Sequence, residues 1–514
     1  MAIRSATLSR RTALSAAFLA VVSLPGFSAF TYQGCADVTD ADFKLTVLNS
    51  NATDPATTEP LKMAFDMDAE GNVDVYFVQR FGLLRKYDGA TKTTVNLGKF
   101  TVPTGGSDGL IGIALDPGFK ANRWIYLYYS TTTEWRVSRF TLAGAQVDMA
   151  SEIVVLSIKQ NQASVHTGGA MQFDRDGNLW ITSGDNSAGQ VPASTMDLRG
   201  KIMRIHPTPD GKYTIPAGNL FPEGTAKTRP EIYIMGNRNP YSLTFDAVRK
   251  AVTWGEVGPD FGGMSEEHDF TTKPGFFGWP YYAGNNIRLG GGGTPEAPIN
   301  TDGGNTGLAN LPPAIPALDS YKQSCALTGP VYYSASFPKA PGKMPPHFDG
   351  MWFVSDFSKG TVEALTLDAA GTKILSRAPV FTKFKIDRPL DFQAGPDGNF
   401  YIVNYAGYRS TSAATGIVRI EYTGSCVGPV GIAAGPRAGG AGDGPSLLAS
   451  GTLVSVASQG GHVLEVKDVS GRLLARYHGQ GMAQYDMRQV AGSGVRLLTL
   501  STGTGILSRK MVIR

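Results

Sequence analysis

The sequence has few cysteines, a low net charge and only one apolar run of any length. Its 514 residues include three cysteines, Cys35, Cys325 and Cys426, which allow at most one internal disulfide and exclude a disulfide-built scaffold. The formal net charge is only +4 and no long basic run occurs, so nothing in the charge supports nucleic-acid binding. Phosphate loops, Cys/His zinc or haem spacings and Ser-centred nucleophile elbows are also absent.

The one apolar run lies at the N-terminus. Arg4, Arg10 and Arg11 precede an apolar stretch at residues 13–24, which is followed by Pro25 and small residues. This order is typical of a cleavable secretory signal, predicted here for residues 1–29, and the apolar stretch is too short for a membrane anchor. No later segment could cross a membrane as a helix. We therefore expect an exported protein in the periplasm, at the cell surface or outside the cell.

Glycine and proline are abundant, with 63 and 31 residues, and one pattern recurs. A Gly/Asp turn followed by an apolar, aromatic strand begins near Phe65, Ala114, Gln172, Thr244, His347 and Phe392. Six units at about one per 63 residues fit four-stranded blades with insertions. The sequence predicts an all-β fold with a six-bladed β-propeller at residues 30–426; an array of β-sandwiches is the alternative.

The C-terminal part has a different composition. Residues 427–446 are rich in Gly, Pro and Ala, as in a linker, and residues 447–514 alternate apolar residues with Gly turns. We expect a small C-terminal β-sandwich there. It resembles the sorting domains of bacteria that use the type IX secretion route, which implies a secretion machinery as partner, and a generic accessory module is the alternative. Cys35 and Cys426 flank the predicted ring, so its closure would bring them together as a disulfide.

Four clusters of polar residues could carry chemistry. His166 precedes the Gly168-Gly169 turn at a loop–strand junction and could accept a proton near neutral pH. The alternative is a purely structural role, which is the interpretation for His206. Arg238 and Asn239 precede Pro240 at a rigid turn.

The third cluster offers oxygen ligands. Gly258 and Pro259 would expose main-chain carbonyls, and Glu266, Glu267 and Asp269 could supply the hard oxygens that calcium prefers, unless they belong to a solvated loop. The fourth cluster contains Lys359 and Arg388, in SDFSKG and IDRPLDFQAGPDG.

Several motifs in fixed order now indicate a family. The segments GLIGIALDPGF, HTGGAMQF, LRGKIMRIHPTPDG, GNRNPY, GPDFGG and GFFGWP follow one another as in the glucose/sorbosone dehydrogenases, and the resemblance spans about residues 43–422. It implies a soluble quinoprotein that uses pyrroloquinoline quinone (PQQ) and Ca²⁺ on the upper face of the propeller.

The resemblance also implies residue roles. His166 would take the hydroxyl proton while hydride moves from C1 of the sugar to the quinone, and Arg238 would stabilise the charge that develops on the quinone oxygen. Asn239 would bind the cofactor, the carbonyls of Gly258 and Pro259 would bind calcium with Glu267 as a further metal ligand, and Lys359 and Arg388 would pair with the cofactor's carboxylates.

Several positions depart from the family pattern. Ser107-Asp108 stands where the best-studied branch has a glutamine, Val165 replaces an aspartate, and Leu390 replaces an arginine. The aromatic pair that covers the cofactor in that branch is not recognisable here, and Tyr332 or Tyr333 is the candidate for its place. The sugar contacts are therefore unlike those of a glucose enzyme.

Together these residues favour quinone-dependent oxidation of an aldose or related sugar, with electrons passed to an external acceptor. A non-catalytic surface propeller that binds glycan or protein is the alternative. A calcium-dependent lactonase ranks last, because only one acidic patch is present.

Overall fold

The computed structural model describes residues 38–513, apart from gaps at 260–264, 323, 338–339, 341, 408–411, 425, 427–445, 451–452, 458–460, 469, 481–482, 488–493 and 504. The predicted signal at residues 1–29, Cys35 and nearly all of the predicted linker lie outside the described residues. Cys426 is disulfide-bonded. None of the described helices is long and apolar enough to cross a membrane.

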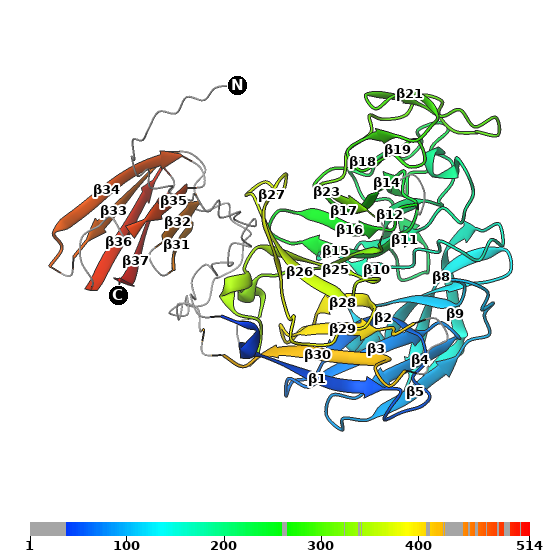
Figure 1. The fold of residues 1–514 in the computed structure, drawn as a ribbon, viewed down its shortest axis with the longest axis horizontal. Helices are drawn as coiled ribbons and strands as arrows, with labels where there is room; N and C mark the ends of the chain where they lie inside the picture. Colours follow the sequence, from blue (N-terminus) through cyan, green and yellow to red (C-terminus); the bar gives the residue numbers. More distant parts are fainter. Residues whose placement is uncertain are drawn as a thin grey trace, which may run out of the picture. The chain divides into compact units, whose positions relative to one another are not determined.

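Six sheets of four or more strands follow one another along the propeller, and their strand pairs are antiparallel except for one parallel pair in the third sheet (Figure 1). Blade 1 contains β2 (Pro60–Met67), β3 (Val73–Gln79), β4 (Leu83–Tyr87) and β5 (Thr94–Lys99). Blade 2 contains β6 (Leu110–Leu115), β7 (Trp124–Ser130), β8 (Glu134–Ala143) and β9 (Gln146–Lys159). Blade 3 contains β10 (Met171–Phe173), β11 (Leu179–Ser183), β12 (Lys201–Pro207), β14 (Ile232–Met235) and β18 (Gly275–Phe276), with β13 (Tyr213–Thr214) paired to β12.

The other three blades repeat this order. Blade 4 contains β15 (Pro240–Asp246), β16 (Ala251–Glu256), β17 (Ser265–Thr271) and β23 (Asp319–Lys322). Blade 5 contains β24 (Ala326–Val331), β25 (Met351–Asp356), β26 (Thr361–Leu367) and β27 (Ile374–Pro379). Blade 6 contains β28 (Pro389–Ala394), β29 (Phe400–Asn404), β30 (Gly416–Tyr422) and, as its outer strand, β1 (Phe43–Ser50).

The innermost strands close a ring. Contacts run from β2 to β6, β10, β15, β24 and β28 in chain order, and β28 returns to β2. The first strand β1 pairs with β30 at the other end of the propeller, with Phe43 opposite Tyr422, so the two ends of this segment join in one sheet. The predicted six-bladed propeller is confirmed, and the six sequence repeats mark the inner strands of the six blades.

The remaining elements of the propeller are short. Two hairpins in the insertion between β18 and β23 consist of β19 (Tyr282–Ala283) with β20 (Ile287–Arg288), and β21 (Gly292–Thr294) with β22 (Ala297–Ile299). The described helical segments are α1 (Phe119–Asn122), η1 (Asp40–Asp42), η2 (Val191–Ala193), η3 (Ser334–Ser336) and η4 (Pro346–Phe348).

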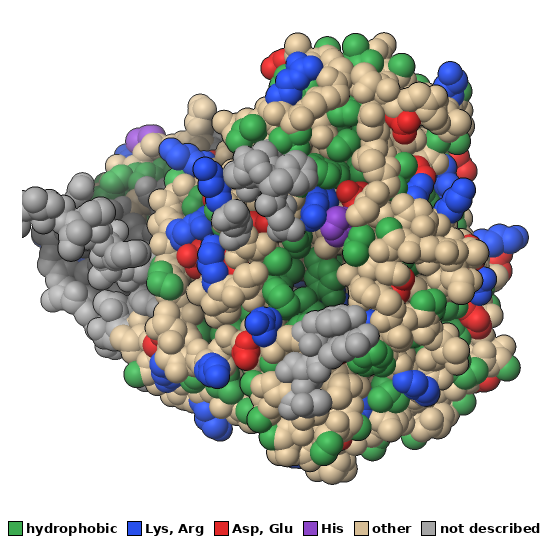
Figure 2. Space-filling view, turned by 45° about the vertical axis from the view of Figure 1, so that its right-hand side comes forward, with side chains coloured by type: hydrophobic (Ala, Val, Ile, Leu, Met, Phe, Trp, Pro, Cys, Tyr) green, Lys and Arg blue, Asp and Glu red, His purple; other side chains and the backbone are tan. Residues whose placement is uncertain are grey.

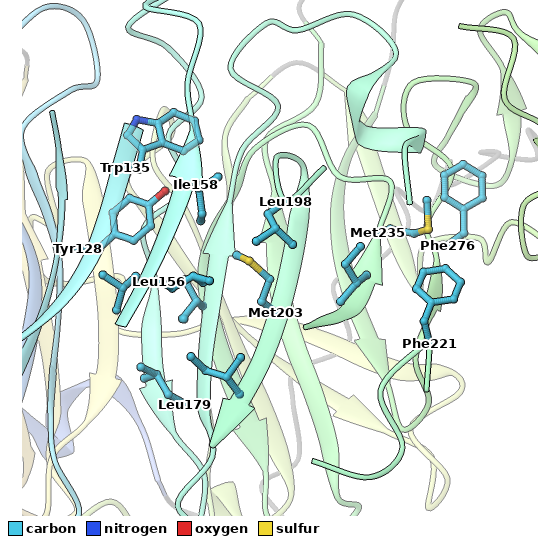
Figure 3. Packing of buried hydrophobic residues seen from close by; sticks show 14 of the residues in the cluster. Tyr128, Trp135, Leu156, Ile158, Leu179, Leu198, Met203, Phe221, Met235 and Phe276 are labelled. Atoms are coloured by element: carbon cyan, nitrogen blue, oxygen red, sulfur yellow. The ribbon is translucent and has the colours of Figure 1, made fainter. Parts of the chain in front are cut away.

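Apolar side chains fill the space between blades. The second strands of the blades, such as β3 and β25, are buried along almost their whole length, because a neighbouring blade covers each face. Figure 3 shows the cluster between blades 2 and 3, where Trp135 and Leu156 lie beside Leu179 and Met203. Aromatic and branched residues after each turn therefore serve both strand formation and packing between blades.

The predicted C-terminal β-sandwich is also confirmed. One sheet contains β31 (Ser446–Ser450), β32 (Leu453–Ala457) and β35 (Ala483–Asp486). The other contains β33 (Gly461–Lys467), β34 (Leu473–Gln480), β36 (Gly494–Thr502) and β37 (Gly505–Ile513). Buried residues of both sheets, including Leu447, Val454, Leu464 and Leu498, form its core.

Replacing Phe43 with Ala is expected to weaken the closure of the ring. Phe43 is 3% exposed, and its ring centroid lies 5.0 Å from that of Phe381 and 5.5 Å from that of Tyr422. Its removal should lower the free energy of unfolding of the propeller by about 3 to 5 kcal/mol, measured by denaturant unfolding. The control is Val47→Ala on the same strand, because Val47 is 53% exposed and should matter little. Equal effects of the two substitutions would contradict this account of the closure.

Candidate active site

The topology gathers the predicted site residues at one end of the propeller. His166, Arg238, Asn239 and Arg388 lie in the loops that enter the innermost strands β10, β15 and β28. The second strand of a blade runs antiparallel to the first, so the loops after β16 and β25 return to the same end. Those loops contain Gly258 with Pro259, and Lys359.

His166 is held by a carboxylate. Its Nδ1 lies 2.6 Å from Oδ1 of Asp185, which follows strand β11 on the same blade. The His166 side chain is 20% exposed and that of Asp185 is 4% exposed. Because a carboxylate accepts hydrogen bonds, Nδ1 of His166 donates, and Nε2 is the nitrogen that can accept a proton.

Asp185 is itself fixed on both oxygens. Its Oδ1 also accepts a hydrogen bond from the amide of Ser187 at 2.8 Å, and its Oδ2 accepts one from Nε1 of Trp279 at 2.9 Å. Trp279 belongs to the GFFGWP segment of the insertion after blade 4 strand β17. Sequence reasoning missed Asp185, although its position in SGDN directly after a buried strand was a usable signal.

Two predicted site residues have left-handed backbone conformations. His166 has φ = 49° and Arg388 has φ = 51°, a region that non-glycine residues adopt rarely and at a cost of roughly 1 to 3 kcal/mol. Neither residue is β-branched, and both lie in loops just before an innermost strand. Such strain is typical of functional sites.

Arg238 and Asn239 connect blades 3 and 4. The backbone amides of both residues donate to Oε1 of Glu256 at 2.6 Å. The guanidinium of Arg238 donates through Nη1 to the carbonyl of Val257 at 2.8 Å, and the Oδ1 of Asn239 accepts from the amide of Gly168 at 3.1 Å. The Arg238 turn and the His166 loop are thus in direct contact.

The next loop presents main-chain oxygens. Gly258 and Pro259 are both buried, and no hydrogen bond between described residues occupies either carbonyl. The amide of Gly258 donates to Oε2 of Glu266 at 3.3 Å, and the same oxygen accepts from Ala326 at 3.0 Å. Glu266 therefore supports this loop.

The side chain of Glu267 lies on the opposite face of the sheet from that of Glu266, because neighbouring strand residues alternate between faces. Its Oε1 accepts a hydrogen bond from the amide of Gly284, and it lies opposite Glu256 in the β16–β17 ladder. Among the described contacts, none links the Glu267 carboxylate to Gly258 or Pro259, so these predicted metal ligands face different surroundings.

These acids are deeply buried. Burial raises the pKa of Glu266 to about 7, and burial together with the Glu266 charge raises that of Glu267 to about 7. Burial and the Glu267 charge also raise the pKa values of Glu256 and Asp269 well above the usual range. The solvated loop that the sequence left open as an alternative for Glu266, Glu267 and Asp269 is wrong, since all three lie buried on β17.

Lys359 and Arg388 are exposed on this same face. The Nζ of Lys359 lies 3.4 Å from Oδ2 of Asp356 and 4.5 Å from the ring centroid of Tyr321. Nη1 of Arg388 donates to the carbonyl of Ala406 at 2.8 Å. Among described residues, no contact joins either cation to His166 or Arg238, whereas His166, Arg238, Asn239 and Gly258 form one contact network.

The interpretation of Tyr332 or Tyr333 as a cofactor cover is wrong. Both follow the far end of β24, whose first residue Ala326 contacts Glu266 at the site face. The hydroxyl of Tyr332 donates to Met344, and that of Tyr333 donates to Asp246 at the end of β15. These tyrosines therefore lie at the opposite end of the propeller.

Figure 2 shows one face of the molecule with a hollow near its centre. Hydrophobic side chains lie at the base of the hollow, and Lys, Arg, His, Asp and Glu side chains lie around its edge. An apolar floor with a charged rim is typical of a site that binds a small ligand.

Comparison with known families decides the assignment. The family model for "Glucose / Sorbosone dehydrogenase" matches residues 57–408, well over half of the chain. This chain belongs to the glucose/sorbosone dehydrogenase family. The matched residues cover the inner strands of all six blades and every predicted site residue from His166 to Arg388.

The relatives include enzymes and other proteins. The chain is 26% identical over 305 residues to the aldose sugar dehydrogenase YliI of Escherichia coli, covering 58% of this chain and 74% of that protein. It is 31% identical over 192 residues to the HIPL1 protein of Arabidopsis thaliana, covering 33% of this chain and only 26% of that protein. The fold is similar to that of the PQQ-bound aldose sugar dehydrogenase of Streptomyces coelicolor, with a TM-score of 0.53, 20% identity, and coverage of 74% of this chain and 98% of that one.

Replacing Asp185 with Asn tests the geometry around His166. Both carboxylate oxygens accept hydrogen bonds, and an amide offers only one acceptor, so either the indole of Trp279 or the His166–Ser187 side loses its partner. We expect the free energy of unfolding to fall by about 1 to 3 kcal/mol in denaturant titrations. Asp176→Asn makes the same chemical change at an exposed position of blade 3 and should have almost no effect. Indistinguishable unfolding curves for the two variants would argue against the buried Asp185 contacts.

Proposed function

We propose that this protein is a PQQ- and calcium-dependent dehydrogenase that oxidises an aldose or related sugar at C1. The observation that carries the proposal is the His166–Asp185 pair, which lies in contact with the Arg238 turn on a face with further exposed cations. Family membership supports the same reaction class. Electrons would leave to an external acceptor, and the predicted signal at residues 1–29 supports export.

His166 would act as the general base. Asp185 holds Nδ1–H and fixes the ring, so the lone pair of Nε2 is left to accept the proton of the C1 hydroxyl. Trp279 and the amide of Ser187 keep Asp185 in place, which restricts the rotation of the imidazole. The removed proton would stay at Nε2 until solvent takes it, since the His166 side chain is partly exposed.

Arg238 would stabilise negative charge that develops next to the sugar. One of its N–H groups is used by the carbonyl of Val257, which fixes the plane of the guanidinium, and its remaining donors are available to a ligand. A preorganised cation of this kind favours the transition state because it needs no reorientation during the reaction.

The residues present fit the proposed cofactor and metal. Lys359 and Arg388 suit carboxylates of PQQ, which when bound would supply the hydride acceptor, and Arg238 is left for the charge that develops on the quinone oxygen. Lys359, whose side chain is 52% exposed, would turn from Asp356 to a ligand carboxylate, while the buried Asp356 keeps its hydrogen bonds from Tyr321 and Ser324. The carbonyls of Gly258 and Pro259 have the hard oxygens that calcium prefers, and Asn239 would donate its side-chain amide to the cofactor.

Glu267 does not add to the proposed metal position at Gly258 and Pro259, because its carboxylate accepts a hydrogen bond from the amide of Gly284 and lies opposite Glu256. Among the described residues, no group of three or more acidic, histidine or cysteine side chains could hold a metal ion. The C-terminal β-sandwich, residues 446–513, is proposed as a domain that the secretion machinery recognises.

A titration with cofactor and metal tests the proposed function. The purified protein is incubated with PQQ and Ca²⁺, and dye reduction is followed with a panel of aldoses. We expect sugar-dependent dye reduction and a change in quinone absorbance only when PQQ and Ca²⁺ are both present, and chelation should abolish it. A protein that binds PQQ weakly or not at all, but binds glycans or a protein partner, would support the non-catalytic alternative.

His166→Ala tests the base. Turnover should fall by about 10²- to 10⁴-fold, with a small change in KM, because the proton acceptor is lost while cofactor contacts remain. His206→Ala is the matched control, because His206 lies on β12 and its Nδ1 is 3.1 Å from Oδ1 of Asn178, away from this network. Similar turnover in the His166 variant and the wild type would exclude His166 as the base.

A further inference from the structure

A buried lysine lies in the central channel of the propeller. Lys62 belongs to β2, the innermost strand of blade 1, and is only 3% exposed. Its Nζ donates to the carbonyl of Leu390 on β28 at 3.0 Å and lies 3.9 Å from the ring centroid of Tyr241 on β15. In a ring of six blades, blades 1 and 4 are opposite, so the contact between Lys62 and Tyr241 crosses the channel.

The lysine lies near the site end of that channel. The strands β2, β15 and β28 begin at the site face. Lys62 is the third residue of β2, and Tyr241 and Leu390 are the second residues of β15 and β28. Tyr241 comes two residues after Asn239, and Leu390 comes two residues after Arg388. The ammonium group therefore lies beneath the two turns that carry Arg238 and Arg388.

The groups around Lys62 compensate its charge only in part. The Asp391 carboxylate attracts it, but that carboxylate also accepts hydrogen bonds from the amide of Met63 at 3.0 Å and from Nε2 of Gln393 at 2.7 Å. The half-buried Tyr241 and the buried Tyr405 have raised pKa values, chiefly because their phenols are removed from solvent, and both stay neutral. Further along, Arg80 and Glu59 pair with each other.

Burial has a larger effect on the pKa of Lys62 than the neighbouring charge has. It lowers the pKa of Lys62 to about 8, although the Asp391 charge acts in the opposite direction. An anion above the channel would act on this ammonium through a medium of low dielectric constant, so the interaction would be stronger than at the surface. Binding of the anion would then favour the protonated lysine.

We propose that Lys62 is a further ligand-binding cation beneath the centre of the site, and that it takes up a proton from solvent when a planar polycarboxylate such as PQQ binds over the channel. This inference rests on the proposed function for the identity of the ligand, but not for the position of the charge. Lys62 would favour cofactors with several carboxylates over neutral quinones, and it would link their affinity to pH.

Calorimetry on the full chain measures the linked proton. PQQ and, separately, the redox-inactive benzene-1,3,5-tricarboxylate are titrated in pairs of buffers that differ in ionisation enthalpy, in the presence of Ca²⁺. The wild type should take up about 0.1 proton per bound ligand at pH 7 and about 0.8 proton at pH 9. These values follow if ligand binding moves the pKa of Lys62 from about 8 to about 10. Affinity should fall over the same interval, because protonation costs more at high pH.

Two variants separate charge from titration. Lys62→Arg keeps the cation but cannot lose its proton in this range, so uptake should vanish at both pH values while binding remains. The double variant Lys62→Met with Asp391→Asn removes both charges, leaves neither buried alone, and should weaken binding about 10- to 100-fold. Lys44→Met is the control, since the Lys44 side chain is 61% exposed and should change neither quantity.

The outcomes distinguish this inference from the proposed function. PQQ binding with the same proton uptake in the wild type and Lys62→Arg would overturn the role of Lys62 and leave the dehydrogenase proposal intact. Binding of the tricarboxylate with Lys62-dependent uptake, but no binding of PQQ, would support Lys62 and count against PQQ. Failure of both ligands to bind the wild type would overturn both proposals.

Discussion

The pairing of β1 with β30 is the constraint on which the rest of the propeller depends. It gives the last blade its outer strand and leaves no gap in the ring of blades, which would otherwise expose an open blade face and strand edge. A closed ring also forces all six innermost strands to run in the same direction around one channel. The loops before those strands then converge on one face, and for this reason residues as distant in sequence as His166 and Arg388 share it.

The convergence of these loops on one face also brings like charges together. Cations that would bind a multiply charged ligand repel one another, and the protein keeps Lys359 and Arg388 exposed, where water screens that repulsion. Buried acidic side chains hold the backbone of neighbouring loops on this face: Glu256 accepts from the Arg238 turn, and Glu266 accepts from Gly258. The exposed cations therefore face solvent, while the buried acidic side chains fix the loops.

The sequence allowed the fold to be predicted because its signal is repeated and local. A Gly/Asp turn and an alternating apolar strand specify an inner hairpin wherever they occur, and six copies specify the ring. The local pattern put His166 at a loop–strand junction and Arg238 at a turn, and the order of the family's motifs gave them, Gly258 and Lys359 their expected roles. The strand order within each blade in the structure brings the loops of these residues to the same end.

What the sequence did not reveal depends on contacts between distant segments. Asp185 resembles any turn aspartate until Trp279 and His166 are seen on its two oxygens. Tyr332 and Tyr333 follow a strand of unknown direction in the sequence, and the direction of β24 puts them at the far end. Glu266 and Glu267 are neighbours with equal chemistry, and only the pleat of β17 separates their roles.

One peptide links the cation and the main-chain oxygens of the site. The carbonyl of Val257 accepts from the guanidinium of Arg238, and the amide of Gly258, in the same peptide group, donates to Glu266. The plane of this peptide is thereby fixed from both sides, and it precedes the carbonyls of Gly258 and Pro259. Since Glu256 positions the amides of Arg238 and Asn239 on the adjacent turn, the cation proposed to stabilise charge and the carbonyls proposed to bind calcium share one hydrogen-bonded frame. Under the proposed function, a change at Arg238 would therefore alter the loop of Gly258 and Pro259 as well as the charge of the site.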